Sequence, residues 1–125
     1  MAISQLKSKR KASGGRLRSS RSKKKQELAG FPTHTKLSNE ERIKVKRVLG
    51  GNSKIKILAA NKISVADKKG KVTVTELVNV VENPANPHLV RRNVITKGAV
   101  VETKLGKVKI TSRPGQEGTV SGKLL

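Results

Sequence analysis

The sequence predicts an all-β protein, a small antiparallel β-barrel that follows a basic, extended N-terminal arm. Three observations lead to this prediction. From residue 43 onward, apolar residues recur with a period of two, which is typical of strands. Turn signals built from Gly, Asn and Pro interrupt these runs at short intervals. The first 25 residues contain ten lysines and arginines and no acidic residue. Short strands with frequent turns favour a closed barrel over an open sheet.

In the first half of the predicted barrel, the sequence predicts two strands joined by a turn. In residues 43–48 Ile43, Val45 and Arg47 alternate with Lys44, Lys46 and Val48, which predicts a strand with one basic face. Gly50-Gly51-Asn52 is a turn signal, and the alternation of Ile55 and Ile57 with lysines then predicts a second strand. Residues 37–47 are the only stretch with helical character, and the alternation within them favours a strand.

In the second half of the predicted barrel, the sequence predicts further short strands. A turn at residues 67–70 precedes Val72, Val74, Val78 and Val80, which are spaced in steps of two. Two prolines exclude residues 83–87 from a helix or a strand interior. Residues 93–96 read as a short strand, and residues 99–104 and 107–112 as a hairpin around Leu105-Gly106. Pro114-Gly115 fits a type II turn, and residues 119–124 form the predicted last strand.

The distribution of charge divides the chain into two parts. Residues 1–27, the predicted arm, hold ten basic residues and one acidic residue, a net charge of +9. Residues 28–125, the predicted barrel domain, hold 19 basic and 7 acidic residues, a net charge of +12. With so little apolar surface, we expect residues 1 to about 25 to be disordered in the free protein and to order on a polyanion. A body this basic is best tolerated against a phosphate backbone.

Composition argues against several other classes of protein. The chain has no cysteine, which excludes disulfides, a thiolate nucleophile and a cysteine zinc site. Neither His34 nor His88 has an evident partner, so we expect no enzyme, no metal site, no cofactor and no small-molecule substrate. No apolar run approaches a membrane span, and no apolar region follows the basic N-terminus, which favours a cytoplasmic protein without membrane contact. With Phe31 as the single aromatic residue, bases cannot be stacked on aromatic platforms.

Several motifs together resemble the family of small-subunit ribosomal protein eight of the archaeal and eukaryotic type. The longest are Val80-Val81-Glu82-Asn83-Pro84-Ala85-Asn86, Val90-Arg91-Arg92-Asn93-Val94-Ile95-Thr96-Lys97-Gly98-Ala99, Glu102-Thr103-Lys104-Leu105-Gly106-Lys107 and Thr111-Ser112-Arg113-Pro114-Gly115-Gln116. Lys11-Ala12-Ser13-Gly14-Gly15-Arg16 and Gly50-Gly51-Asn52-Ser53-Lys54 resemble two further motifs of the family. The resemblance implies a β-barrel of the shorter, archaeal form. It also implies a structural constituent of the small ribosomal subunit, with ribosomal RNA and neighbouring ribosomal proteins as partners.

The candidate RNA contacts are basic residues, with a few residues that let the backbone approach phosphates. In the arm they are Lys7, Lys9, Arg10, Lys11, Gly14, Gly15, Arg16, Arg18, Arg21, Lys23, Lys24 and Lys25. In the body they are Asn52, Lys54, Lys56, Arg91, Arg92, Lys97 and Arg113. Arg91 and Arg92 follow a loop stiffened by two prolines, and their planar guanidinium groups suit bidentate phosphate binding.

Each feature also has an alternative interpretation. Basic runs are commonly solvated surfaces, and the Gly14-Gly15 and Gly50-Gly51 pairs can be simple turns. Arg113-Pro114-Gly115 is first of all a turn. Charge alone also fits a DNA-binding architectural protein of the chromatin type, because only a 2′-hydroxyl or A-form geometry distinguishes RNA from DNA.

Deleting residues 1–25 should reduce the salt dependence of RNA binding, because each phosphate contact releases counterions on binding. We expect the slope of log affinity against log salt to fall by roughly 0.7–0.9 for each lost contact. Filter binding over a range of salt concentrations measures this slope. An unchanged slope would mean that the arm contacts no phosphate.

Overall fold

The computed structural model describes residues 8–18, 20–21 and 24–125. Contacts along the chain separate two compact units, one ending at Pro32 and one running from Thr33 to Leu125. The division at Pro32 is based on contacts between residues, whereas the predicted end of the arm at residue 27 is based on the distribution of charge. The boundary at residue 27 therefore stays a prediction.

The described part of the N-terminal unit contains local backbone structure. An antiparallel bridge joins Arg10 to Arg16, and Lys11 N–H donates to the Gly15 carbonyl at 2.8 Å. Gly14 turns the chain with a φ of 84°, a conformation that favours glycine. A 3-10 helix, η1 (Lys25–Glu27), follows, and Glu27 forms an ion pair with Arg21. Hydrogen bonds from the Arg21 side chain and the Lys24 backbone lower the pKa of Glu27.

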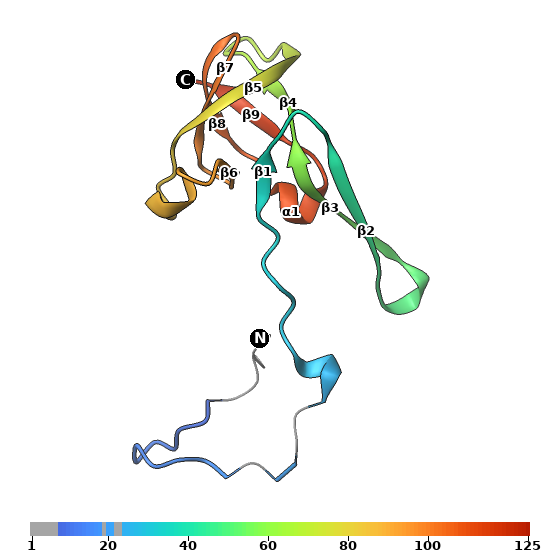
Figure 1. The fold of residues 1–125 in the computed structure, drawn as a ribbon, viewed down its shortest axis with the longest axis vertical. Coiled ribbons are helices and arrows are strands. Elements are labelled where there is room, and N and C mark those ends of the chain that lie inside the picture. Colours follow the sequence, from blue (N-terminus) through green and yellow to red (C-terminus); the bar gives the residue numbers. More distant parts are fainter. Residues whose placement is uncertain (1–7, 19, 22–23) are drawn as a thin grey trace. The chain divides into compact units, whose positions relative to one another are not determined.

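Five strands close into the barrel of the second unit (Figure 1). They are β4 (Lys62–Ala66), β5 (Val72–Glu82), β7 (Val100–Thr103), β8 (Gly106–Ile110) and β9 (Ser121–Leu124). Neighbouring strands pair antiparallel except β4 and β9, which close the barrel as a parallel pair with Ser64 opposite Ser121. Closure leaves no unpaired edge in this sheet, which protects a small protein against edge-to-edge association.

The barrel interior is filled by branched aliphatic side chains. Val65, Val101 and Val108 are fully buried, and Ile63 and Ile110 are nearly so. Gly122 on β9 has no room for a side chain, because a Cβ there would lie 2.5 Å from Val108 Cγ1 and 2.9 Å from the Lys109 carbonyl oxygen. The interior is therefore packed tightly enough that one methyl group cannot be added at this point.

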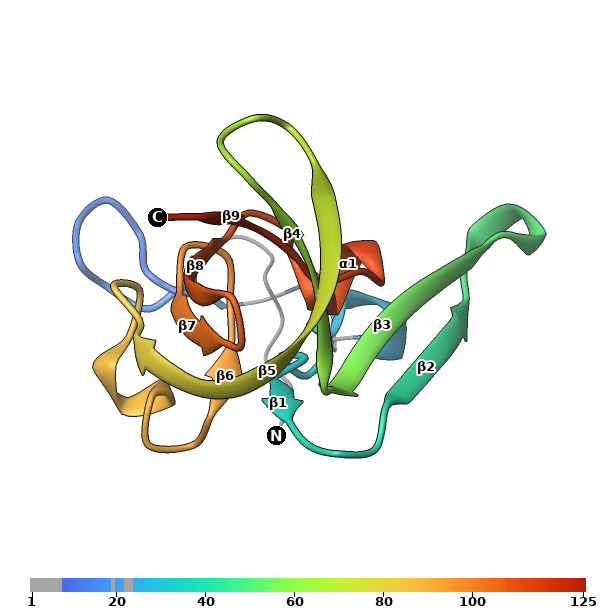
Figure 2. The ribbon, with the colours of Figure 1, turned by 90° about the horizontal axis from the view of Figure 1, so that it is seen from above.

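A second sheet contains four strands in the order β2-β3-β1-β6. Their bounds are β1 (Thr35–Leu37), β2 (Arg42–Arg47), β3 (Ser53–Ala60) and β6 (Val94–Ile95). The short helix η2 (Leu49–Gly51) connects β2 to β3, and η3 (Pro87–Leu89) precedes β6. The hairpin of β2 and β3 extends away from the barrel strands in two perpendicular views (Figures 1 and 2). The α-helix α1 (Pro114–Glu117) packs against β3.

The structure confirms the predicted all-β barrel and most of its strands, with three differences. Pro114-Gly115 does not form a type II turn: it begins α1, because proline suits the first turn of a helix as well as a turn, and the left-handed residue is Gly118, with a φ of 72°. Neither β1 nor β4 was predicted. The alternative of a helix over residues 37–47 is wrong, since this segment contains the last residue of β1, a bend and the whole of β2.

Replacing Gly122 with alanine should destabilise the protein by about 1–3 kcal/mol through overpacking of the barrel interior. Thermal unfolding of the two proteins measures the difference. Gly30→Ala is the control, because no atom lies within 4 Å of a Cβ there and its φ is not left-handed. We expect that control to change stability by less than about 0.5 kcal/mol. Equal melting temperatures for wild type and Gly122→Ala would contradict the packing described for β9.

Candidate nucleic-acid interface

The β2–β3 hairpin holds four lysines in direct register. Lys44 lies opposite Lys56, and Lys46 lies opposite Lys54. Because residues opposite each other in an antiparallel pair share one face of the sheet, the four side chains project to the same side. We call this set the lysine ladder. Lys56 is half-buried and the other three are exposed, so the ammonium groups can reach a ligand on that side.

Like charges directly opposite each other destabilise a strand pair. Within the part of the chain that the structure describes, the four ion pairs all involve other residues, so no ion pair offsets the charge of the lysine ladder. The opposed Cβ atoms in such pairs are roughly 4.5–5.5 Å apart, and salt screens only part of the repulsion. A bound polyanion would remove this cost, which makes the lysine ladder the strongest candidate for a phosphate contact.

The loop between β5 and β6 presents Arg91 and Arg92 on a well-ordered backbone. Asn83 is 2% exposed, and its side chain donates to Thr96 Oγ1 at 2.8 Å and accepts from the Ala85 and Asn86 backbone. Asn86 in turn caps η3 by accepting from His88 N–H at 3.0 Å. Arg92 N–H donates to the Leu89 carbonyl at 3.2 Å, and Asn93 N–H donates to the Val90 carbonyl at 2.9 Å, just before β6. The fold therefore fixes this backbone without using the guanidinium groups, which are exposed.

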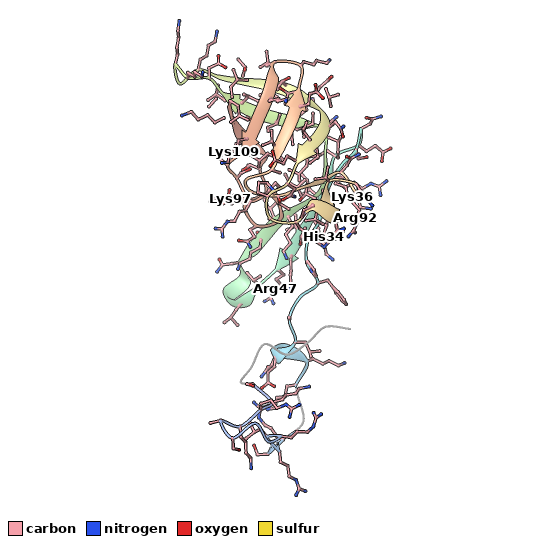
Figure 3. All side chains as sticks on the ribbon, turned by 90° about the vertical axis from the view of Figure 1, so that its left-hand side faces the viewer. His34, Lys36, Arg47, Arg92, Lys97 and Lys109 are labelled. Carbon is pink, nitrogen blue, oxygen red and sulfur yellow. The ribbon has the colours of Figure 1, made fainter. Side chains whose placement is uncertain are left out.

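A further cation lies beside this loop. β1 pairs antiparallel with β6, with Lys36 opposite Val94, and Leu37 N–H donates to the Asn93 carbonyl at 2.9 Å. This pairing brings Lys36 next to the segment that follows Arg92, and the two residues are labelled close together in Figure 3. The loop lies on the opposite side of the barrel from the tip of the β2–β3 hairpin in both ribbon views (Figures 1 and 2). The basic surface thus contains two separate groups of cations.

Lys97 and Arg113 lie in a more neutral setting, because both are near Glu117. The Arg113 side chain and its backbone N–H both bind the Glu117 carboxylate, at 3.3 and 3.1 Å. The hydrogen bond from the Arg113 backbone lowers the pKa of Glu117, and the positive charge of Lys97 acts in the same direction. The carboxylate closes the first turn of α1, so Arg113 already has an anionic partner inside the protein.

The residues predicted from sequence do not converge on one patch. Asn52, Lys54 and Lys56 lie on the hairpin, while Arg91 and Arg92 lie on the far loop. In the arm, the ten predicted residues within the described ranges are all exposed, and Lys7 and Lys23 lie outside those ranges. Sequence reasoning missed Lys44, Lys46 and Lys36 as contacts. The alternation around Lys44 and Lys46 gave the basic face of the strand, and only the pairing register shows that this face continues onto β3.

Two other structural features are absent from the described ranges. No helix there has the length and apolar character needed to cross a membrane. The same ranges contain no group of three or more histidine or carboxylate side chains placed to hold a metal ion.

Fold and surface together define a small, strongly basic all-β protein whose cations gather on a projecting hairpin and a rigid loop. Comparison with known families gives its membership: the chain belongs to the family described as Ribosomal protein S8e, whose model matches residues 4–125. The resemblance seen in the sequence is therefore confirmed.

Three relatives show how far the similarity extends. The chain is 49% identical over 126 residues to the small ribosomal subunit protein eS8 of Methanobrevibacter smithii, covering 100% of both chains. It is 46% identical to the protein of that name from Methanococcus aeolicus, covering 100% of this chain and 98% of the relative. It is 50% identical to the one from Staphylothermus marinus, covering 93% and 91%.

Replacing Arg91 and Arg92 with lysines should weaken binding to small-subunit ribosomal RNA at constant net charge. Lysine lacks the planar fork of donors that fits two phosphate oxygens. We expect a loss of about 1–2 kcal/mol, or roughly 5–30-fold in affinity, with a melting temperature close to that of the wild type.

Arg47→Lys is the control, since it makes the same chemical change on an exposed strand residue that projects away from the lysine ladder, and it should leave affinity nearly unchanged. If the loop variant and the control both bind like the wild type, Arg91 and Arg92 are not RNA contacts. A large fall in melting temperature for the loop variant would instead mean that the two arginines hold the fold together.

Proposed function

We propose that this protein is a structural constituent of the small ribosomal subunit and binds ribosomal RNA through phosphate and shape contacts. Membership of the Ribosomal protein S8e family and the names of its relatives support this role. On this proposal the protein works in the cytoplasm, within the ribosome and beside other ribosomal proteins. It has no catalytic activity, because its task is to hold RNA in place.

The lysine ladder is the observation that carries the RNA-binding part of the proposal. Four uncompensated cations in register are costly in the free protein and favourable against phosphates. The two strands hold the cations in fixed rows, so the lysine ladder meets a nucleic-acid backbone as a preformed surface. Aliphatic strands without aromatic residues favour recognition of folded RNA by backbone shape over recognition of unpaired bases.

The two groups of cations on the barrel unit are proposed to contact different segments of RNA. The tip of the β2–β3 hairpin and the loop between β5 and β6 lie on opposite sides of the barrel (Figures 1 and 2). The lysine ladder and the group of Lys36, Arg91 and Arg92 therefore each contact their own segment of RNA. Held by a rigid body, two such contacts fix the relative position of the two segments. The arm adds further phosphate contacts, and its eight basic candidates within the described ranges are all exposed.

Charge reversal of one row of the lysine ladder tests the proposal with two readouts of opposite sign. Lys44→Glu with Lys46→Glu places a carboxylate opposite Lys56 and another opposite Lys54. Each repulsive pair becomes attractive, so the free protein should gain roughly 0.2–1 kcal/mol of stability for each pair. Affinity for a small-subunit ribosomal RNA transcript should fall, and the salt slope should fall by roughly 0.7–0.9 for each lost phosphate contact.

Lys68→Glu with Lys69→Glu is the control, because it makes the same change in net charge at the exposed turn between β4 and β5. We expect a smaller loss of affinity from that control and no gain in stability. Equal losses for the two variants would show that only overall charge matters. Double-stranded DNA of matched length serves as competitor, and equal binding of DNA and RNA would favour the DNA-binding alternative.

A further inference from the structure

The face of the β2–β3 hairpin that lies opposite the lysine ladder is apolar. The same register places Ile43 opposite Ile57 and Val45 opposite Ile55. Ile57 is buried, whereas Ile43, Val45 and Ile55 are 54%, 63% and 46% exposed. We call these three exposed residues the apolar face. Because the side-chain period of a strand is two, the lysine ladder and the apolar face point to opposite sides of the hairpin.

Helix α1 covers only the inner part of this side of the hairpin. A Cβ at Gly118, just after α1, would lie 2.9 Å from Ile55 Cγ2, so the end of the helix lies directly against Ile55. β2 is the outer strand of its sheet and pairs only with β3. Ile43 and Val45 are therefore uncovered beside a helix that already packs on their neighbour, and Leu49 at the hairpin tip is 94% exposed. Adjacent exposed aliphatic residues on a projecting element are typical of an interaction surface.

Three kinds of occupant fit this face poorly. RNA would find no aromatic ring for stacking and no row of cations, since the lysine ladder is on the reverse side. An anionic membrane would need a cluster of basic groups on the apolar side, and the four lysines of the lysine ladder lie on the other side. A second copy of a chain with a net charge of +21 would be repelled at the approach.

Arg47 indicates the chemistry of a fourth kind of occupant, a neighbouring protein. It is the last residue of β2, two positions after Val45, and so projects on the side of the apolar face. Its side chain is exposed near the hairpin tip (Figure 3), and none of the ion pairs among the described residues includes it. A guanidinium at the border of an aliphatic patch is complementary to a carboxylate placed at the border of another one.

We propose that the apolar face docks an aliphatic segment of a neighbouring protein, with a carboxylate of that segment paired to Arg47. The hairpin then binds RNA on one side and a protein on the other, so it joins the two. This proposal goes beyond the RNA binding proposed above. It rests on the proposed function in one respect only: the small ribosomal subunit is where the protein would meet the neighbouring protein.

Photo-crosslinking from adjacent residues tests it. A diazirine amino acid, which reacts with protein and RNA alike, replaces Val45 on the apolar face or Lys44 on the lysine ladder. Cells are irradiated intact, so adducts are scored wherever the protein is located. Position 45 should give an adduct with one protein species, and mass spectrometry should locate the link in an aliphatic segment containing Asp or Glu. Position 44 should give an adduct with RNA.

Arg47→Glu combined with the position 45 probe should reduce that protein adduct several-fold, while Arg47→Lys should retain most of it. An RNA adduct from position 45, no intermolecular adduct, or a yield unaffected by Arg47→Glu would each overturn the proposal. Sedimentation of the same samples tests the proposed function separately, because a ribosomal protein should cosediment with small subunits. A protein adduct from position 45 without cosedimentation with small subunits would support the docking surface and contradict the ribosomal role.

Discussion

The register of the β2–β3 hairpin is the constraint on which the functional surface depends. A shift of one residue between these strands would move every side chain to the other face. In the observed register, four lysines are collected on one side and three exposed aliphatic residues on the other. The bulge between Arg42 and Ile43 marks the inner end of this arrangement, where the hairpin meets the rest of the sheet. The hairpin is thus an unfavourable element in isolation, with repulsion on one face and exposed hydrocarbon on the other.

The closed barrel provides the stability that this hairpin lacks. Its aliphatic interior is sealed on all sides by paired strands, and the cations of those strands point outward. β3 leads into β4 with only Asn61 between them, so the hairpin is joined directly to the barrel wall. The side chain of Asn61 donates to the Asn39 carbonyl at 2.9 Å, which ties the chain before β2 to this junction. The energetic cost of a charged hairpin is therefore offset by burial elsewhere in the same unit.

Most of the fold could be predicted from sequence because its signals are local. The alternation of Ile43 and Val45 with lysines gave β2, and Leu105-Gly106 gave the β7–β8 hairpin. β4 was missed in the sequence because no Gly or Pro separates it from β3. The chain bends at Asn61 and enters a different sheet. Pro114-Gly115 was misread because its local signal fits two structures, and packing of α1 on β3 decides between them. The parallel closing pair of β4 and β9 depends on residues far apart in the chain, which no local pattern shows.

The candidate site, too, depends on strand pairing that local sequence patterns do not show. Lys54 and Lys56 could be proposed from the sequence, but their partners Lys46 and Lys44 become visible only when the strands are paired. Arg91 and Arg92 were chosen for the stiffness of the proline loop. The structure adds the hydrogen bonds of Asn83 and Asn86 as a reason for that stiffness. Binding of RNA by these residues stays a prediction.

Amide hydrogen exchange along β2 and β3 tests the central claim most directly, because it measures the opening free energy of the hairpin itself. In the free protein at low salt, these amides should exchange faster than those of the barrel strands. They should become more protected as salt is raised and more protected still on binding small-subunit ribosomal RNA. Protection of β2 and β3 that is already equal to that of the barrel, and unchanged by salt and RNA, would contradict the account.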